Sequence, residues 1–196
     1  MPTAKLALSG NPAADELLST DPLALLIGMV LDQQIPLERA FSSPLDLKQR
    51  LGGRLEAEEI AAMDPDRLAA VFGERPALHR FPAANAKRVQ ELCRIVVDGY
   101  GGRAADIWTG AADGEDLYRR VRALPGFGEQ KARIFVGLLA KQLGVRPPGW
   151  EEAAGRFGRP GTFMSVADIV DRESLGRVRA YKQEMKAAAK AARDGS

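Results

Sequence analysis

The sequence predicts an all-α fold. Apolar residues recur at helical spacing along nearly the whole chain, and no stretch shows the sustained alternation that a half-buried strand needs. Proline and glycine stand where these segments begin and end, as helix termini require. With 196 residues, 45% of them hydrophobic, the chain is long enough to bury a core in one globular unit or two small lobes.

The first predicted helix is apolar on almost every side. Asp21 is a suitable N-cap and Pro22 a suitable first residue. The helix is expected to run through "PLALLIGMVLDQQI", residues 22–35. Because it lacks a polar face, it is predicted to be buried rather than amphipathic.

The middle of the chain predicts several further helices. "RPALHRFP", residues 75–82, is a loop between them. The expected helices are short ones over 45–52 and 57–63, one over 65–73 that closes at Gly73, and a long amphipathic one over 84–102.

The last third contains two more helices, 114–124 and 129–144, and then changes texture. Residues 145–163 are dense in glycine and proline and predict a long irregular segment with one helical turn at 150–155. A short capped helix over 165–171 and a basic final helix over 173–193 follow. The basic residues of that helix are open to two interpretations, a solvated face or a DNA-facing surface.

Composition excludes several classes of site. The net charge of +2 does not by itself indicate a nucleic-acid partner. Cys93 is the only cysteine and His79 the only histidine, so disulfides, cysteine-based metal sites and an iron–sulfur cluster cannot be built from these residue types. The longest apolar run, residues 23–31, is too short to span a bilayer. No signal peptide opens the chain, so a reducing cytoplasm without membrane attachment is expected.

The stretch "LPGFGEQKA", residues 124–132, predicts a tight turn between two helices. The glycines Gly126 and Gly128 allow positive φ and close approach of a ligand to the backbone. The second helix begins with unpaired N–H groups and the positive end of its dipole, which suits a phosphate or a cation bridging to one. Phe127 is placed to pack between the helices. The alternative is an ordinary helical corner in which glycine serves only steric needs.

"LPGFGEQKARIF" resembles the hairpin of the helix–hairpin–helix–GPD DNA glycosylases, the superfamily of endonuclease III, the adenine glycosylase and 3-methyladenine glycosylase II. "DPLALLIGMVLDQQIPLERA" is similar to that family's early buried helix, and "FPAANAKRVQELCRIVVDGYGG" to its helix before the hairpin. The resemblance implies two helical lobes with a DNA groove between them. Residues 21–140 would form one lobe, and 1–20 with 141–196 the other.

The family flips a damaged base out of double-stranded DNA and cleaves its glycosidic bond. The resemblance therefore implies a duplex DNA partner, with Gly126, Phe127 and Gly128 at a phosphate and room for a monovalent cation at the hairpin backbone. Gln33 and Gln34 would lie near the space that the base vacates. His79, without a partner in sequence, is expected to be a surface or packing residue.

Two departures from the family pattern bear on the chemistry. Where some members carry a nucleophilic lysine this chain has Gln130, and Lys131 follows about 100° further round the helix. Lys131 is therefore expected to point elsewhere, as a phosphate contact or a surface charge beside the DNA-facing Gln130. A lyase step through a Schiff base is not expected.

The family's catalytic aspartate is also missing, because counting to its usual distance ends at residues 148–150 and no aspartate stands between residues 117 and 167. Glu151 is the predicted substitute, Glu152 a weaker one, and Asp168 lies too far along by count. Such a carboxylate would stabilise a cationic sugar. Trp150 is expected either to stack on a flipped base or to pack between the lobes.

The sequence thus predicts a monofunctional base-excision DNA glycosylase without cofactor, which hydrolyses the bond of a modified base through Glu151. Two alternatives stay open. One is a non-catalytic module of the same fold that recognises damaged or distorted DNA. The other is a helical protein–protein adaptor in which the hairpin is only a corner.

Overall fold

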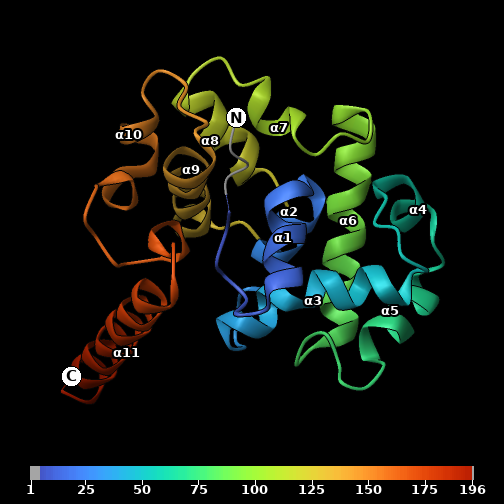
Figure 1. Ribbon diagram of the computed structural model, residues 1–196, viewed down its shortest axis with the longest axis horizontal. Helices are drawn as coiled ribbons and strands as arrows, with labels where there is room; N and C mark the ends of the chain where they lie inside the picture. The colour runs from blue at the N-terminus through green and yellow to red at the C-terminus, as the bar shows by residue number, and fades with distance from the viewer. Residues whose placement is uncertain (1–4, 196) are drawn as a thin grey trace.

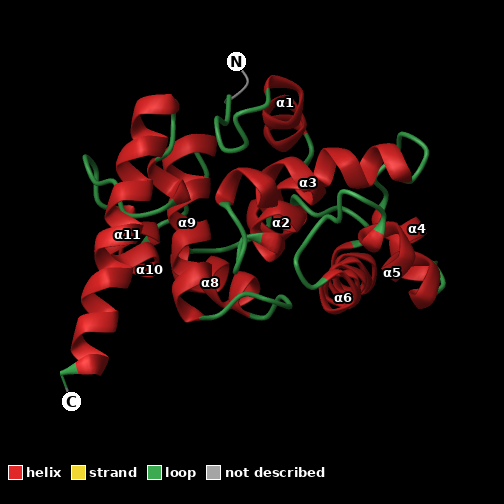
Figure 2. Ribbon diagram, turned by 90° about the horizontal axis from the view of Figure 1, so that it is seen from below, coloured by secondary structure: helices red, strands yellow, loops and turns green. Residues whose placement is uncertain are grey.

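The computed structural model describes residues 5–195, which form helices joined by turns and loops with no strand among them (Figures 1 and 2). This confirms the all-α prediction. In chain order the elements are α1 (Pro12–Thr20), α2 (Pro22–Leu31), α3 (Leu37–Arg50), α4 (Ala57–Ala62), α5 (Pro65–Gly73), α6 (Pro82–Tyr100), α7 (Asp106–Thr109), α8 (Gly114–Arg122), α9 (Glu129–Leu143), α10 (Trp150–Ala154), the 3-10 turns η1 (Gly155–Gly158) and η2 (Val166–Asp168), and α11 (Arg172–Asp194).

Helix α2 lies at the centre of the molecule, packed against α1, α3 and α6. The Asp21 side chain accepts hydrogen bonds from the first-turn N–H groups, and every residue from 23 to 31 is buried, as predicted. The helix ends at Leu31 and not at residue 35, which corrects the expected end. Gln34 has a left-handed φ of 59°, and Pro36 disfavours helical backbone in the residue before it.

Helix α3 replaces the short helix expected over 45–52. It begins at Leu37 and runs through Pro44, which lacks the N–H that the helix would use. The Ser43 hydroxyl donates to the carbonyl oxygens of Arg39 and Leu78, at 2.7 and 2.9 Å, which ties this region to the following loop. Burial of Phe41, Pro44 and Leu47 on the same helix offsets the proline penalty.

Helix α6 organises one end of the molecule, where α4 and α5 pack against it. Its buried face includes Val89, Leu92, Cys93 and Val96, as its amphipathic pattern predicts. Burial raises the pKa of the Cys93 thiol to about 12. Cys93 is therefore an unreactive packing residue.

The other end is built around the α8–α9 hairpin, with α10 packed against both helices and η1 and η2 against α9. Helix α11 is attached there through its first turns only, where Leu175 and Val178 are buried. The rest of α11 projects away from the body (Figure 1).

Helix α1 packs against α2 and α3. The assignment of residues 1–20 to a lobe with 141–196, apart from 21–140, stays a prediction, and residues 1–4 lie outside the described part. Of the helices within residues 5–195, none is both long and apolar enough to cross a membrane.

Candidate nucleic-acid interface and its pocket

The two hairpin glycines have different conformations. Gly126 has φ of 80°, in the left-handed region, whereas Gly128 has φ of −71° and is the N-cap of α9. The expected need for positive φ therefore holds at Gly126 alone. A Cβ added at Gly128 would meet no atom within 4 Å. Gly128 thus presents backbone with open space in front of it.

The N-terminus of α9 is an anion-attracting feature of this turn. Within residues 5–195 no side chain caps its first N–H groups, so these donors and the positive end of the helix dipole are available to a ligand. Arg122 donates to the carbonyl oxygen of Phe127 at 3.1 Å. The Arg88 side chain passes close to Gly126, since its Cδ lies 3.9 Å from a Cβ built there. Two arginines therefore flank the hairpin.

Phe127 fixes the hairpin from inside. Its side chain is 2% exposed, and its ring centroid lies 5.7 Å from that of Phe135 on α9. Its N–H donates to the Leu124 carbonyl at 3.2 Å. Side chain and N–H are both engaged within the protein, so the surface of the turn is left to Gly126 and Gly128.

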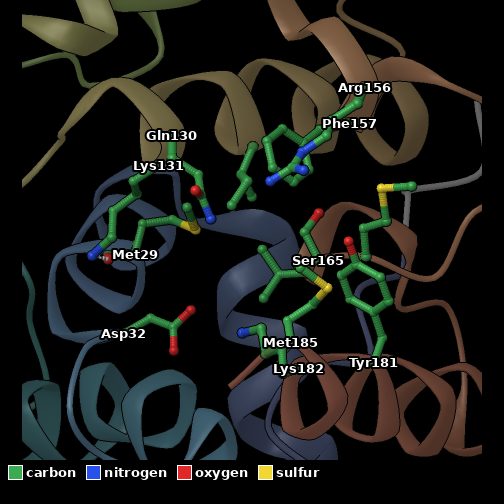
Figure 3. A pocket seen from close by; sticks show the side chains of 13 residues that line it. Met29, Asp32, Gln130, Lys131, Arg156, Phe157, Ser165, Tyr181, Lys182 and Met185 are labelled. Carbon is green, nitrogen blue, oxygen red and sulfur yellow. Dashed lines mark hydrogen bonds between the residues drawn. The ribbon is translucent and has the colours of Figure 1, made fainter. Parts of the chain in front are cut away.

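A pocket of about 470 Å³ opens beside the first turns of α9 (Figure 3). Its walls come from the end of α2, the start of α9, η1, the segment before η2, and α11. The lining side chains are those of Met29, Asp32, Gln130, Lys131, Ile134, Arg156, Phe157, Met164, Ser165, Val166, Tyr181, Lys182 and Met185. This volume lies within the usual range of small-molecule sites.

Asp32 holds the carboxylate of this pocket. It is the C-cap of α2, and its N–H donates to the Gly28 carbonyl at 3.0 Å. The carboxylate points into the cavity (Figure 3), and within residues 5–195 no hydrogen-bond donor is bound to it. Burial raises the pKa of Asp32, and the nearby charges of Lys182 and Lys131 partly offset this.

The position of Asp32 is unfavourable for stability. A negative charge at a helix C-terminus opposes the helix dipole, and a partly buried carboxylate with no donor within residues 5–195 loses part of its hydration, although its oxygen atoms remain accessible to solvent. An acid that is unfavourable both for the helix dipole and for hydration of its charge is typical of functional sites.

Lys131 lies on the same side of the pocket as Asp32. Its Nζ donates to the Met29 carbonyl near the end of α2, at 2.7 Å. Burial lowers the pKa of Lys131 to about 8. Asp32 opposes that shift, while Arg88 and Lys182 add to it. The Lys131 ammonium thereby stabilises both the carbonyl end of α2 and the negative charge of Asp32.

The divergence of Lys131 from Gln130 that the helix spacing predicts is present in the structure, while a phosphate contact through Lys131 stays a prediction. Their side chains do diverge: Lys131 reaches toward Met29 while Gln130 points to the middle of the cavity (Figure 3). Both nevertheless line the pocket, because it extends from α2 on one side of α9 to η1 on the other. Lys131 is therefore partly buried and not an ordinary surface charge.

Gln33 and Gln34 form the turn directly after Asp32, and neither lines the pocket. The buried His79 holds this turn. Its Nδ1 accepts from the Phe81 N–H and the Asn85 amide, so Nε2 carries the proton and donates to the Gln33 carbonyl at 2.8 Å. Burial lowers the pKa of His79, in keeping with a neutral ring. Its expected role as a packing residue fits this geometry.

Glu151 lies in a different depression. It is exposed on α10 and shares its depression with Trp150, Phe163 and Asp168, while none of the residues lining that depression lines the Asp32 pocket. Glu152 is exposed as well. Trp150 is partly buried, with the Arg146 guanidinium 5.9 Å from its ring centroid. A catalytic role for Glu151 or Glu152 and base stacking by Trp150 stay predictions.

Asp168 is fully engaged and is not free to act on a substrate. Its carboxylate pairs with Lys141 at 2.6 Å and accepts hydrogen bonds from the Thr162 hydroxyl and the N–H groups of Met164 and Ser165. Its side chain is only 4% exposed. Asp168 is therefore a structural acid, whereas the Asp32 carboxylate, which has no bound donor within residues 5–195, is the candidate functional one.

A family model described as "HhH-GPD superfamily base excision DNA repair protein" matches residues 27–194, a span that contains both the hairpin and the pocket. The chain belongs to this superfamily. The match confirms the resemblance seen in the sequence, assigns the chain a glycosylase-like function in base excision repair, and implies DNA binding. Neither the comparison with curated proteins nor that with solved structures found a match.

Sequence reasoning missed Asp32 and Arg88, whereas Lys182 belongs to the basic final helix for which a DNA-facing surface was one of the two interpretations. For Asp32 a signal was present: in "VLDQQIP" an acid directly follows a helix of buried residues, where a base or a glycine is favoured. For Arg88 no local signal exists, because its place beside the hairpin depends on how distant helices pack. The basic bias of the final helix marks Lys182, but only the packing of α11 places it at the pocket.

Proposed function

We propose that this HhH-GPD protein is a monofunctional DNA glycosylase, which hydrolyses the glycosidic bond of a modified base in duplex DNA with Asp32 as the acting carboxylate. The supporting observation is the Asp32 carboxylate itself, unpaired, partly buried and directed into a pocket beside the hairpin. This proposal differs from the sequence-based choice of Glu151, which lies in a separate depression.

In this proposal the hairpin binds the DNA backbone and the pocket holds the nucleotide whose glycosidic bond is cleaved. The backbone of Gly126 and Gly128 and the N-terminus of α9 would hold a phosphate, which positions the strand without reading its sequence. The flipped nucleotide would enter the pocket next to the hairpin. Ionised Asp32 would stabilise the positive charge that develops on the sugar and orient the attacking water, as carboxylates do in glycoside hydrolysis.

Lys131 supports hydrolysis rather than strand cleavage. A pKa of about 8 would by itself favour Schiff-base chemistry, but the Lys131 side chain diverges from that of Gln130, which occupies the position of the family's nucleophilic lysine (Figure 3). The Lys131 Nζ is also held by the Met29 carbonyl. The ammonium would serve as counter-charge to Asp32, and the DNA strand would be left intact.

The test is single-turnover base release from duplexes that each carry one of a broad panel of lesions, with strand nicking measured in parallel. Asp32→Asn is compared with Asp66→Asn, a matched change at an exposed aspartate of α5. Asp32→Asn is expected to lower the release rate by about 10²- to 10³-fold, as loss of one electrostatic group does, and Asp66→Asn to leave it unchanged.

Glu151→Gln in the same assay decides between the two carboxylates. Loss of release in Glu151→Gln with retention in Asp32→Asn would move the reaction to the α10 depression and refute the role of Asp32. DNA binding without release from any lesion would favour the non-catalytic module. Nicking that accompanies release and is lost in Lys131→Met would refute monofunctional hydrolysis.

A further inference from the structure

Helix α11 becomes a free-standing arm after its first turns. Leu175 and Val178 are buried against the body, and Arg179 forms an ion pair with Glu38 of α3. From residue 182 to 194 every position is exposed, and the helix runs away from the other elements (Figures 1 and 2). The alanine-rich run over 187–192 has high helix propensity, which favours helical structure without tertiary support.

Four basic side chains share one face of this arm. They stand at positions related by four, four and three residues, which keeps them within about 80° around the helix axis and spreads them over about 16 Å. This basic stripe consists of Lys182, Lys186, Lys190 and Arg193. Within residues 5–195 none of the four forms an ion pair. Glu184 lies on the opposite face by the same spacing.

The basic stripe begins at the proposed reaction site. Lys182 lines the Asp32 pocket, and its side chain is drawn beside that cavity in Figure 3. The three remaining charges lead away from the pocket along the arm. A row of like charges on one helix face, beginning at the mouth of this pocket, suits a phosphate backbone that runs past the pocket.

We propose that the basic stripe of α11 binds the phosphate backbone of the DNA flanking the damaged nucleotide. This inference rests on the proposed function, because the stripe starts where the flipped nucleotide would enter. Duplex DNA carries one negative charge per about 1.7 Å of axis, so an arm of this length faces several phosphates. Such contacts add affinity and orientation without sequence preference.

The experiment measures binding of undamaged duplex DNA by fluorescence anisotropy across a range of salt concentrations. The variant carries Lys186→Gln, Lys190→Gln and Arg193→Gln together and leaves Lys182 in the pocket intact. Glutamine keeps helix propensity while removing charge. The matched control removes three exposed charges from the opposite end of the molecule and carries Arg67→Gln, Arg75→Gln and Arg94→Gln.

If the stripe holds three phosphates, the slope of log Kobs against log salt becomes shallower by about 2.7, at about 0.9 per phosphate contact. The control is expected to keep the wild-type slope. An unchanged slope in the stripe variant, or an equal change in both variants, overturns the inference. Binding to phosphatidylserine vesicles is measured in parallel. A stripe variant that loses vesicle binding but keeps DNA binding would also overturn the inference, because the stripe would then bind an anionic membrane instead.

The same measurements separate this inference from the proposed function. If wild-type protein releases a base and the stripe variant keeps the wild-type salt slope, the DNA-binding role of the stripe is refuted while the proposed function stands. Wild-type protein without salt-dependent affinity for DNA refutes the proposed function, and the stripe with it. Circular dichroism and urea unfolding of both triple variants establish that any difference arises from charge and not from loss of folding.

Discussion

The partly buried Lys131 ammonium is expected to make the stability of this protein rise with pH in the alkaline range. Its pKa is about 8 in the folded chain against 10.5 for an ordinary lysine. Each pKa unit corresponds to about 1.4 kcal/mol, so holding the charged form in the fold costs about 3 kcal/mol. Between these two pKa values the unfolded chain binds more protons, and stability therefore increases with pH. The cost is present in full below pH 8 and is relieved by about pH 10.5.

The assay is urea unfolding of wild type and Lys131→Met at intervals from pH 7 to 10.5. Because other groups titrate in this range, the informative quantity is the difference in unfolding free energy between the two proteins. Wild type is expected to gain about 3 kcal/mol relative to Lys131→Met across the range. Lys87→Met, a matched change at an exposed lysine of α6, is expected to show a constant difference from wild type.

A pH-independent difference between wild type and Lys131→Met would refute the reasoning. It would mean that water reaches Lys131 freely and that the pocket does not desolvate its charges. The same water would reach Asp32, so the argument from its raised pKa would be lost as well.

Three further outcomes are expected from single substitutions. Gly128→Ala should weaken DNA binding without changing the free energy of unfolding, because its Cβ meets only open space in the free protein, while Gly73→Ala should leave anisotropy-measured DNA affinity unchanged. Asp168→Ala should destabilise the fold by about 3–5 kcal/mol in urea unfolding, since it removes the carboxylate that neutralises the partly buried Lys141 charge. Phe127→Ala should cost about 3–5 kcal/mol by the same measurement, because it empties a packed position against α9.

The Asp32 side chain lowers the stability of the fold. The fold places it at the negative end of α2, partly out of water and without a hydrogen-bond donor in the described part of the chain. A neutral residue there would be more favourable for folding. The lysines near it reduce that cost without pairing with the carboxylate directly, which leaves its oxygen atoms open to the cavity.

The sequence by itself determined the elements that depend on local chemistry. The bounds of α5 and the first residues of α8 and α9 followed from capping residues, prolines and glycines, and the buried character of α2 from its composition. Local rules failed at Pro44, where burial of Phe41, Pro44 and Leu47 against other elements supports α3 through a proline that predicts a break.

Only the tertiary structure decided which carboxylate stands beside the hairpin. Counting along the chain led to Glu151, because distance in sequence cannot foresee how a glycine- and proline-rich segment is routed over the surface. The decisive neighbours come from opposite ends of the chain: Lys131 bonds to the Met29 carbonyl 102 positions away, and α11 supplies Lys182. No local sequence pattern predicts that these residues lie close together, because their proximity arises from the packing of α9 and α11 around the end of α2.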